Sequence, residues 1–536
     1  MSVRRRALLS AAASLPLVAA CRRKPEPHYD GGWVGAQHER GHRVRDLKSG
    51  SLPSPALTRR VNVLVVGAGV AGLACARELA RRKIDDVHLL DLEDAPGGNS
   101  RGHRIAGMAC PLGAHYLPVP NEADVDVVEL LAELGLSRIE QGRRVYDERH
   151  LCHSPQERLF VDGQWHEGLL PVHDQPAATL AQYRRFADEV SQAATLGFSL
   201  PTSRSPWTAA HQALDATPFA QWLDERRFDA PALRTYLDYC CRDDYGAGPA
   251  QVSAWAGLHY FASRHGFHAP GVADGEEREG VLTWPQGNAW LTERLAAPHR
   301  ERLHAGQVAL RVEEKKHGVT IDVWDANTQQ LARWQAEQVV MATPLFISAR
   351  LLVSPPPALQ AAASQMHYAP WLVANLHLDE PLHDTGGAPP AWDNVRHGSA
   401  SLGYVDAMHQ STRPYAGPTV LTSYWALGGN SPEQLRGQRE RLLRDDWASW
   451  SRAVLDDLAP AHPDLPAKVK RVDLMRYGHA MSIPVPGLRS HAALAALSRT
   501  NRRVHFAHSD LSGYSVFEEA FFHGTQAGVR LTRPQP

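Results

Sequence analysis

The 536-residue chain lacks an excess of charge of either sign, since 57 Lys and Arg balance 58 Asp and Glu. This balance predicts neither a nucleic acid nor an acidic membrane surface as a partner. Cysteine is also sparse, and six Cys in 536 residues exclude a disulfide scaffold. Lysine is scarce, since only seven of the 57 basic residues are Lys and the others are Arg. With 43% hydrophobic and 21% charged residues, wholesale disorder is excluded.

The apolar stretch at the start of the chain is too short to span a membrane. Three arginines precede an apolar segment from Ala7 to Ala20, which is shorter than the roughly 20 residues that a membrane helix needs. Basic residues before a short apolar segment are typical of an export signal. Arg5-Arg6 resembles a twin-arginine signal, and Val18-Ala19-Ala20-Cys21 resembles a bacterial lipobox. Residues 1–21 therefore predict export to the bacterial periplasm or cell envelope. Either Cys21 is lipidated and anchors the protein, or ordinary cleavage after Ala20 releases it.

Residues 22–60 have little apolar periodicity and are predicted to form a tether and an irregular lead-in. His38-Glu39-Arg40-Gly41-His42 matches the HExxH zinc pattern, which functions only on a helix. Glycines within and before this stretch favour a solvated loop. We therefore expect no metal site, here or elsewhere in the chain.

A dinucleotide fingerprint follows this lead-in. Val61–Val66 has the composition of a buried parallel strand, and Leu73–Lys83 and Val87–Asp91 are predicted to be a helix and a second strand. The GxGxxG motif between the first strand and the helix predicts a tight turn, a close approach to a pyrophosphate, and close helix packing. A helix N-terminus favours bound phosphate, and the acid ending the second strand is placed to bind a ribose. The predicted binding residues are Gly67, Gly69, Ala71, Gly72 and Asp91.

The next residues resemble the flavin-containing amine oxidase superfamily. Asp91 is followed by the pair Gly97-Gly98, and Asn99 stands where the family carries Arg. Pro111–Tyr116, with Gly113 and Ala114, looks like the segment that passes the flavin ring in that family. The resemblance implies FAD as cofactor. The FAD is expected to bind non-covalently, because no Cys occupies the position at which the flavin is usually attached covalently in that family.

A second set of family features lies near the other end of the chain. Arg503–Ala507 is predicted to be a strand, and Phe517–Arg530 is predicted to be a helix. The resemblance implies that Asp510 holds the ribityl chain, that Phe517 and Glu518 begin the helix facing the flavin, and that Val308 meets the adenine. Glu519 departs from the family, which usually has a small residue there.

The expected fold is α/β, with a doubly wound, Rossmann-like FAD-binding domain and an α+β substrate domain inserted in two parts. The FAD-binding segments are residues 61–120, 276–350 and 476–536. The substrate domain comprises residues 121–275, which are mostly helical by their pattern, and residues 351–475. Helical spacing of apolar residues predicts helices over residues 124–135, 177–194, 218–226 and 231–241.

The resemblance implies transfer of a hydride equivalent from the carbon beside an amine nitrogen to flavin N5. Expected pocket aromatics are Tyr514, Phe517, Trp425 and Tyr477. Oxidases of this family often carry a Lys in a strand that here runs from Trp371 to Pro381 and contains none, so no catalytic residue is assigned. The missing Lys favours a periplasmic electron acceptor other than oxygen.

Two alternatives stay open. One is a flavin-dependent C–C dehydrogenase, desaturase or porphyrinogen-oxidase-like enzyme, which a pocket lacking acids and facing aromatics would favour. The other is a flavin-binding envelope protein without turnover. Asp243-Asp244 and Glu518-Glu519 could attract a polyamine, although paired acids usually form a solvated face.

Overall fold

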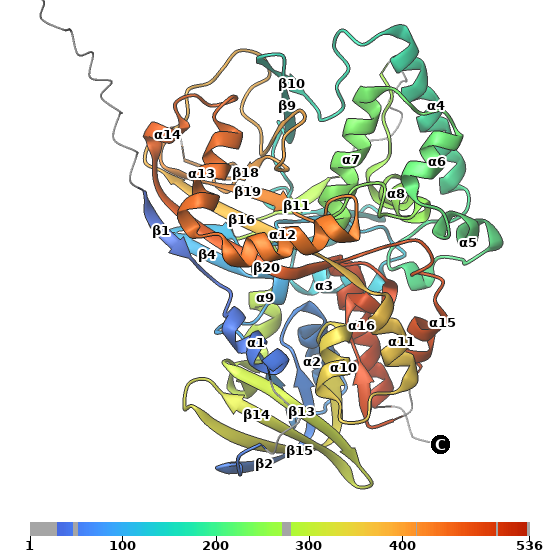
Figure 1. The fold of residues 1–536 in the computed structure, drawn as a ribbon, viewed down its shortest axis with the longest axis vertical. Coiled ribbons are helices and arrows are strands. Elements are labelled where there is room, and N and C mark those ends of the chain that lie inside the picture. Colours follow the sequence, from blue (N-terminus) through green and yellow to red (C-terminus); the bar gives the residue numbers. More distant parts are fainter. Residues whose placement is uncertain (1–28, 47–51, 271–279, 414, 500–501, 533–536) are drawn as a thin grey trace, which may run out of the picture.

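The computed structural model describes residues 29–46, 52–270, 280–413, 415–499 and 502–532. Cys21 and the rest of the predicted export signal lie outside them. Two large sheets form the framework, one below and one above in Figure 1. No helix among the described residues is both long and apolar enough to cross a membrane.

The lower sheet carries the dinucleotide fingerprint. Its central strands are parallel and come from three distant parts of the chain, as predicted. In the sheet the order is β12-β3-β2-β15-β14-β13, and β21 also pairs with β15. The bounds are β2 (Leu57–Val66), β3 (Val87–Leu90), β12 (Leu303–His304), β13 (Gln307–Lys315), β14 (Gly318–Asp325), β15 (Gln330–Met341) and β21 (Val504–Phe506).

Two helices, α2 (Val70–Arg81) and α16 (Phe517–Leu531), pack against each other on this sheet. A Cβ at Gly524 would lie 2.1 Å from the carbonyl oxygen of Ala71, so only glycine permits this approach. The N-termini of α2 and α16 consequently lie at the same edge of the sheet. Other helices of this part are α9 (Ala289–Ala296), α10 (Leu345–Leu351), α11 (Pro357–Gln365) and α15 (Ala492–Leu497).

The upper sheet has the order β1-β20-β16-β19-β18-β17-β9-β10. Strand side chains alternate between its faces, so Tyr424 packs toward one apolar cluster and Trp425 toward another. Helices α12, α13 and α14 lie near one face, and α4 to α8 gather beside the sheet (Figure 1). The strand bounds are β1 (Asp30–Trp33), β9 (Glu157–Val161), β10 (Gln164–Glu167), β16 (His367–Leu378), β17 (Asp393–Arg396), β18 (Tyr404–Asp406), β19 (Thr419–Ala426) and β20 (Val469–Ile483).

The predicted helices of the middle region are present, with small shifts at their ends. Amphipathic patterning identified α3, α4, α6 and α7 because each has apolar side chains at helical spacing. Helix bounds here are α3 (Val125–Glu133), α4 (Ala177–Ala194), α5 (Ala209–Asp215), α6 (Phe219–Glu225), α7 (Pro231–Tyr245), α8 (Ala254–Tyr260), α12 (Pro432–Arg444), α13 (Trp447–Leu458) and α14 (Leu465–Lys468).

The mostly helical prediction is wrong for residues 137–167, which contain β7, β8, β9 and β10. Each of these strands has four or five residues, and β9 pairs with β17, which lies more than 200 residues further along the chain. Short strands with distant partners leave no clear periodicity. Remaining strands are β4 (Gly102–Ile105), β5 (Met108–Pro111), β6 (Tyr116–Pro118), β7 (Ser137–Glu140), β8 (Arg143–Tyr146) and β11 (Val281–Thr283).

The described part of residues 22–60 is not irregular, which corrects the predicted tether and loop. It holds β1, helix α1 (His38–Asp46) and the start of β2. Tertiary packing stabilises α1 despite Gly41, because Val44 is buried and Arg43 stacks 4.4 Å from the centroid of Trp324. His38 and His42 do come together, with ring centroids 5.3 Å apart. Among the described residues, no three His, Cys, Asp or Glu side chains are placed so that they could hold a metal ion.

Candidate active site

A cavity of about 470 Å³ lies between the two sheets and is lined by residues of both. Its volume is typical of a small-molecule site. One end is formed by the fingerprint after β2, and the other by α7 and strands β16, β19 and β20 of the upper sheet. The N-terminal residues of α2 and α16 both line it, so two positive helix ends face the cavity.

Glycines form the wall at the fingerprint end. Gly67 has φ 106°, a left-handed conformation that L side chains avoid. Gly69 and Gly98 face each other, since a Cβ at Gly69 would lie 3.7 Å from Cα of Gly98. Gly67, Gly69, Ala71, Gly97 and Gly98 line the cavity. Gly72 lies behind this wall, where a Cβ would come within 1.9 Å of the Gly67 oxygen, so its role is close packing.

Asp91 lies at the end of β3 with its carboxylate at the cavity wall. It accepts hydrogen bonds from the backbone N–H groups of Ala68 and Glu93, each at 2.8 Å. Burial raises the pKa of Asp91 above its usual value. The carboxylate thus fixes the glycine turn and stands where a dinucleotide ribose binds in such folds.

Two predicted cofactor contacts lie beside the cavity wall rather than on it. Val308 is flanked by Gln307 and Ala309, which line the cavity, and the contact predicted for Val308 is through its backbone. Asp510 is fully buried and is also absent from the cavity wall, whereas His508 and Ser509 are on it. Its Oδ2 accepts hydrogen bonds from the Leu345 N–H at 2.9 Å and the Tyr368 hydroxyl at 2.6 Å. Asp510 therefore ties the turn to the start of α10.

The segment predicted to pass the flavin ring does line the cavity. Gly113 has no room for a side chain, since a Cβ would lie 2.1 Å from the Asn99 oxygen. Ala114 donates its N–H to the same oxygen at 2.9 Å. Asn99 also lines the cavity, and its side-chain amide donates to the Ala480 oxygen at 2.5 Å.

Several aromatic side chains line the cavity. Tyr477 does so as predicted, and its hydroxyl donates to the Leu112 oxygen at 2.8 Å. Phe517 also lies there, as predicted. His115 stacks on Tyr424 with centroids 4.3 Å apart. Burial lowers the pKa of His115 to about 3, so the ring is neutral near pH 7. Trp371, Tyr116 and Tyr368 also line the cavity.

Two predicted pocket aromatics are not in the pocket. Tyr514 is fully buried behind it, with its ring 6.1 Å from Trp255 and 5.6 Å from His259. Trp425 points to the opposite face of the upper sheet, where it packs edge-on against Trp450. Its sequence neighbour Tyr424 faces the cavity instead, because adjacent residues of a strand point to opposite faces.

The reading of the paired acids as a solvated face is wrong. Asp243, Asp244 and Glu518 all line the cavity, and Glu519 is fully buried. Asp244 forms a buried ion pair with Arg264. Burial raises the pKa of Asp243 to about 7 and also raises that of Glu518. Three acids thus share one arginine at this end, which we call the acidic end (Asp243, Asp244, Glu518 and Arg264).

Glu519 has a structural explanation for its departure from the family. Its carboxylate accepts a hydrogen bond from the Thr202 N–H at 2.5 Å and another from the Ser512 hydroxyl. Ser512 also contacts His523 at 2.7 Å. These bonds join α16 to the segment around Thr202, so both carboxylate oxygens of the larger side chain have hydrogen-bond partners.

The residues present fit FAD. A wall of glycines backs the cavity, Asp91 stands at the ribose position, and two helix N-termini face the space where phosphates and a flavin would lie. None of the described residues that line the cavity is a cysteine. The fold and site thus define an oxidoreductase that binds FAD non-covalently.

The chain belongs to the flavin containing amine oxidoreductases, whose family profile matches residues 70–532. A protein named as a flavin-containing monoamine oxidase, AofH, of Mycobacterium tuberculosis is 27% identical over 289 residues. That alignment covers 53% of this chain and only 57% of the relative's length.

Solved structures of similar fold include a putrescine oxidase bound to putrescine, with TM-score 0.65 and 17% identity, covering 88% of this chain and 99% of that one. Cyclohexylamine oxidase from Brevibacterium oxydans has TM-score 0.62 and 19% identity, covering 88% of this chain and 98% of that chain. At these identities the likeness shows the fold.

Proposed function

We propose that the protein oxidises the C–N bond of an amine carrying a second positive charge, such as a diamine or polyamine. The acidic end carries this proposal, because Arg264 pairs with Asp244 while two further carboxyl groups, those of Asp243 and Glu518, line the cavity beside the aromatics. A cation that enters there favours the ionised forms of these carboxyl groups. Such a site favours a distant ammonium group of the substrate. The putrescine named for one fold relative is a substrate of this chemical type.

FAD held by the glycine wall and Asp91 would supply the redox chemistry, which is uptake of a hydride equivalent from the carbon beside nitrogen. The protein's part is to position the substrate and exclude water. Tyr424, Tyr477 and Trp371 offer flat apolar surfaces that hold an alkyl chain. Neutral His115 adds no positive charge that would repel the amine. The acids and aromatics of the cavity together favour C–N oxidation. A cavity without them would instead suit C–C oxidation.

The electron acceptor that we propose is a periplasmic carrier rather than oxygen. None of the described residues that line the cavity is a lysine, in agreement with the missing Lys of β16. We also propose that the protein is exported through its twin-arginine signal and anchored through Cys21, on the sequence alone. Twin-arginine export carries folded proteins and so suits one that loads its cofactor first.

The decisive experiment is an anaerobic flavin-bleaching screen. The protein without residues 1–21 is mixed with putrescine, spermidine, benzylamine and a fatty acid, and the visible flavin absorbance is followed. We expect the dications to bleach the flavin faster than benzylamine, and recolouring in air to be slow. Rapid recolouring would overturn the proposed acceptor. Bleaching by the fatty acid alone would support C–C oxidation, and no bleaching by any compound would support a protein without turnover.

A further inference from the structure

The N-terminal residues Asp30–Asp46, which we call the strap, join the two halves of the molecule. At one end β1 pairs in parallel with β20 of the upper sheet, with Asp30 opposite Arg471 and Trp33 opposite Leu474. The N–H of Val34 continues this pairing by donating to the Leu474 oxygen at 2.8 Å. The strap then crosses to the lower sheet as α1, which lies between the two sheets in Figure 1.

The other end of the strap is packed onto the FAD-binding half. Val44 is buried in the apolar cluster that also contains Val308 and Ala309 of β13. Arg350, from α10, donates to the Arg45 oxygen at 2.6 Å. The helix is thus held on two sides by the lower half.

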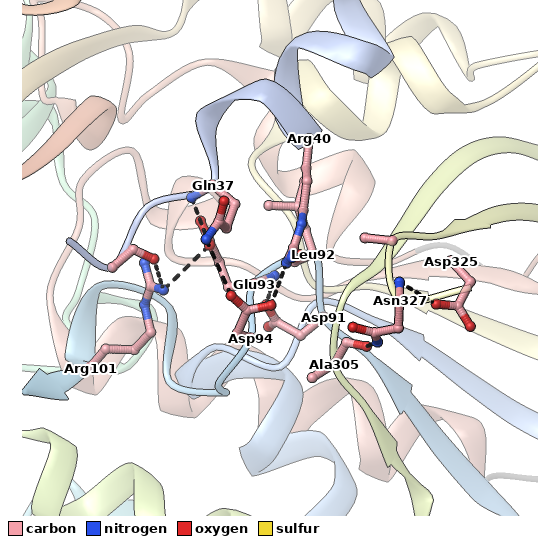
Figure 2. Close-up of polar contacts among 12 residues, drawn as sticks. Gln37, Arg40, Asp91, Leu92, Glu93, Asp94, Arg101, Ala305, Asp325 and Asn327 are labelled. Atoms are coloured by element: carbon pink, nitrogen blue, oxygen red, sulfur yellow. Dashed lines mark hydrogen bonds and ion pairs between the residues drawn. The ribbon is translucent and has the colours of Figure 1, made fainter. Parts of the chain in front are cut away.

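Polar contacts connect the strap to the loop that follows β3, the loop that begins with Asp91 (Figure 2). The N–H of Gln37 donates to Glu93 at 3.0 Å, and its side-chain amide donates to Asp94 at 3.2 Å. Arg40 donates to the Leu92 oxygen at 2.8 Å and forms an ion pair with Asp94 at 2.7 Å.

The strap also reaches the cavity itself. Gly41 and Val44 line it beside Asp91 and Leu92, at the end where a dinucleotide places its adenosine ribose. A Cβ at Gly41 would meet no protein atom within 4 Å, so this face of α1 is not packed against protein. Bound adenosine therefore has the strap as one of its walls.

We propose that the strap closes the adenosine end of the FAD site and that Arg40 and Gln37 set the rate at which FAD leaves. Release requires the loop after β3 or α1 to move, and both are joined by these side chains. The proposal depends on FAD binding and not on the substrate. It is therefore tested separately from amine oxidation.

The test measures FAD release from the purified holoprotein after dilution, by the rise in flavin fluorescence. Arg40→Ala removes a hydrogen bond and an ion pair, so we expect release about 5- to 30-fold faster. Gln37→Ala should give a smaller increase. The matched control is Arg45→Ala on the same helix, because Arg45 is exposed and its side chain pairs with its neighbour Asp46. The control should release FAD at the wild-type rate.

Asp94→Asn tests the same contact from the other side, in case Arg40→Ala folds poorly. It should accelerate release, and the double variant should release FAD more slowly than the two single effects multiplied together, because both variants remove the same ion pair. Added salt should speed release from the wild type more than from Arg40→Ala, because salt screens the exposed ion pair. Wild-type release rates in both single variants, or an equal increase in Arg45→Ala, would overturn the proposal.

Discussion

Single residues determine the charge of the cavity. Asp243 and Asp244 follow two buried cysteines on α7, and the chain folds so that both acids face the cavity rather than solvent. Arg264, twenty residues further on, pairs with only one of them. The sequence showed the pair of acids but not their partner, because an ion pair between α7 and the segment after α8 depends on tertiary packing. The burial of Tyr514 was not predictable for the same reason.

Asp243→Asn should weaken binding of dications in a pH-dependent way. The pKa of Asp243 in the folded protein is about 7, so the side chain is neutral below this pH and negative above it. At pH 8 the variant should raise KM for putrescine about tenfold, the equivalent of about 1.4 kcal/mol. At pH 6 the effect should be small. Steady-state kinetics at the two pH values measure both.

The control for this prediction is benzylamine, which has no second cation and whose KM should stay within about twofold. Stability gives a second readout. Ionisation of Asp243 is unfavourable in the folded protein, so the wild type loses stability as pH rises from its unfolded pKa near 3.8 through about 7. Asp243→Asn should abolish that part of the loss. An identical pH profile of stability in both proteins would contradict this assignment.

At the scale of elements, periodicity predicted the long helices and buried strands well. β2, α2 and α4 have apolar residues at the spacing of their secondary structure, and each lies within a few residues of its prediction. Sequence periodicity missed the strands that are short and pair with distant parts of the chain, such as β9, which pairs with β17. Helix α1 was missed because its stability comes from packing on β13 and α10, not from helix propensity.

The contact between α2 and α16 depends on a glycine. Gly524→Val would place a side chain against the backbone of Ala71, 2.1 Å away, and force the helices apart. We expect a loss of about 2–4 kcal/mol in the free energy of unfolding and weaker FAD binding, because both helix N-termini line the cavity. Urea denaturation and flavin titration measure the two effects.

Gly437→Ala, within α12, is the matched control. A Cβ there would meet no atom within 4 Å, so the substitution should stabilise the protein by about 0.5–1 kcal/mol through helix propensity. FAD affinity should not change. If Gly524→Val were as stable as Gly437→Ala, close approach of the two helices would not be required.

At the scale of the whole molecule, two sheets enclose one cavity and the strap joins them. The family profile, the fold and the sequence motifs agree on an FAD-dependent oxidoreductase. Fingerprint motifs predicted the cofactor end because they are local in sequence. The substrate end was predicted less well, since its aromatics and acids come from α7, α16 and three strands of the upper sheet. The direction of each side chain from these strands depends on the strand register. A one-residue shift in register turns every side chain of a strand to the opposite face of the sheet.

The location of the protein is tested by Cys21→Ser. If Cys21 carries a lipid, the wild-type protein should fractionate with membranes after export, and the variant should appear in the soluble periplasmic fraction. Flavin content should be equal in both, because the substitution precedes the first described element at Asp30. Equal fractionation of the two proteins would show that Cys21 is not the anchor.

The pairing of β1 with β20 also governs when the molecule can form during synthesis. Asp30 leaves the ribosome about 440 residues before its partner Arg471. Strand β15 is likewise made before its partner β21. Helix α16, which completes the cavity, emerges later still. A nascent chain therefore has no finished flavin site. FAD is therefore captured by the completed polypeptide, and β1 stays unpaired until β20 has been made, exposed to aggregation and to proteases.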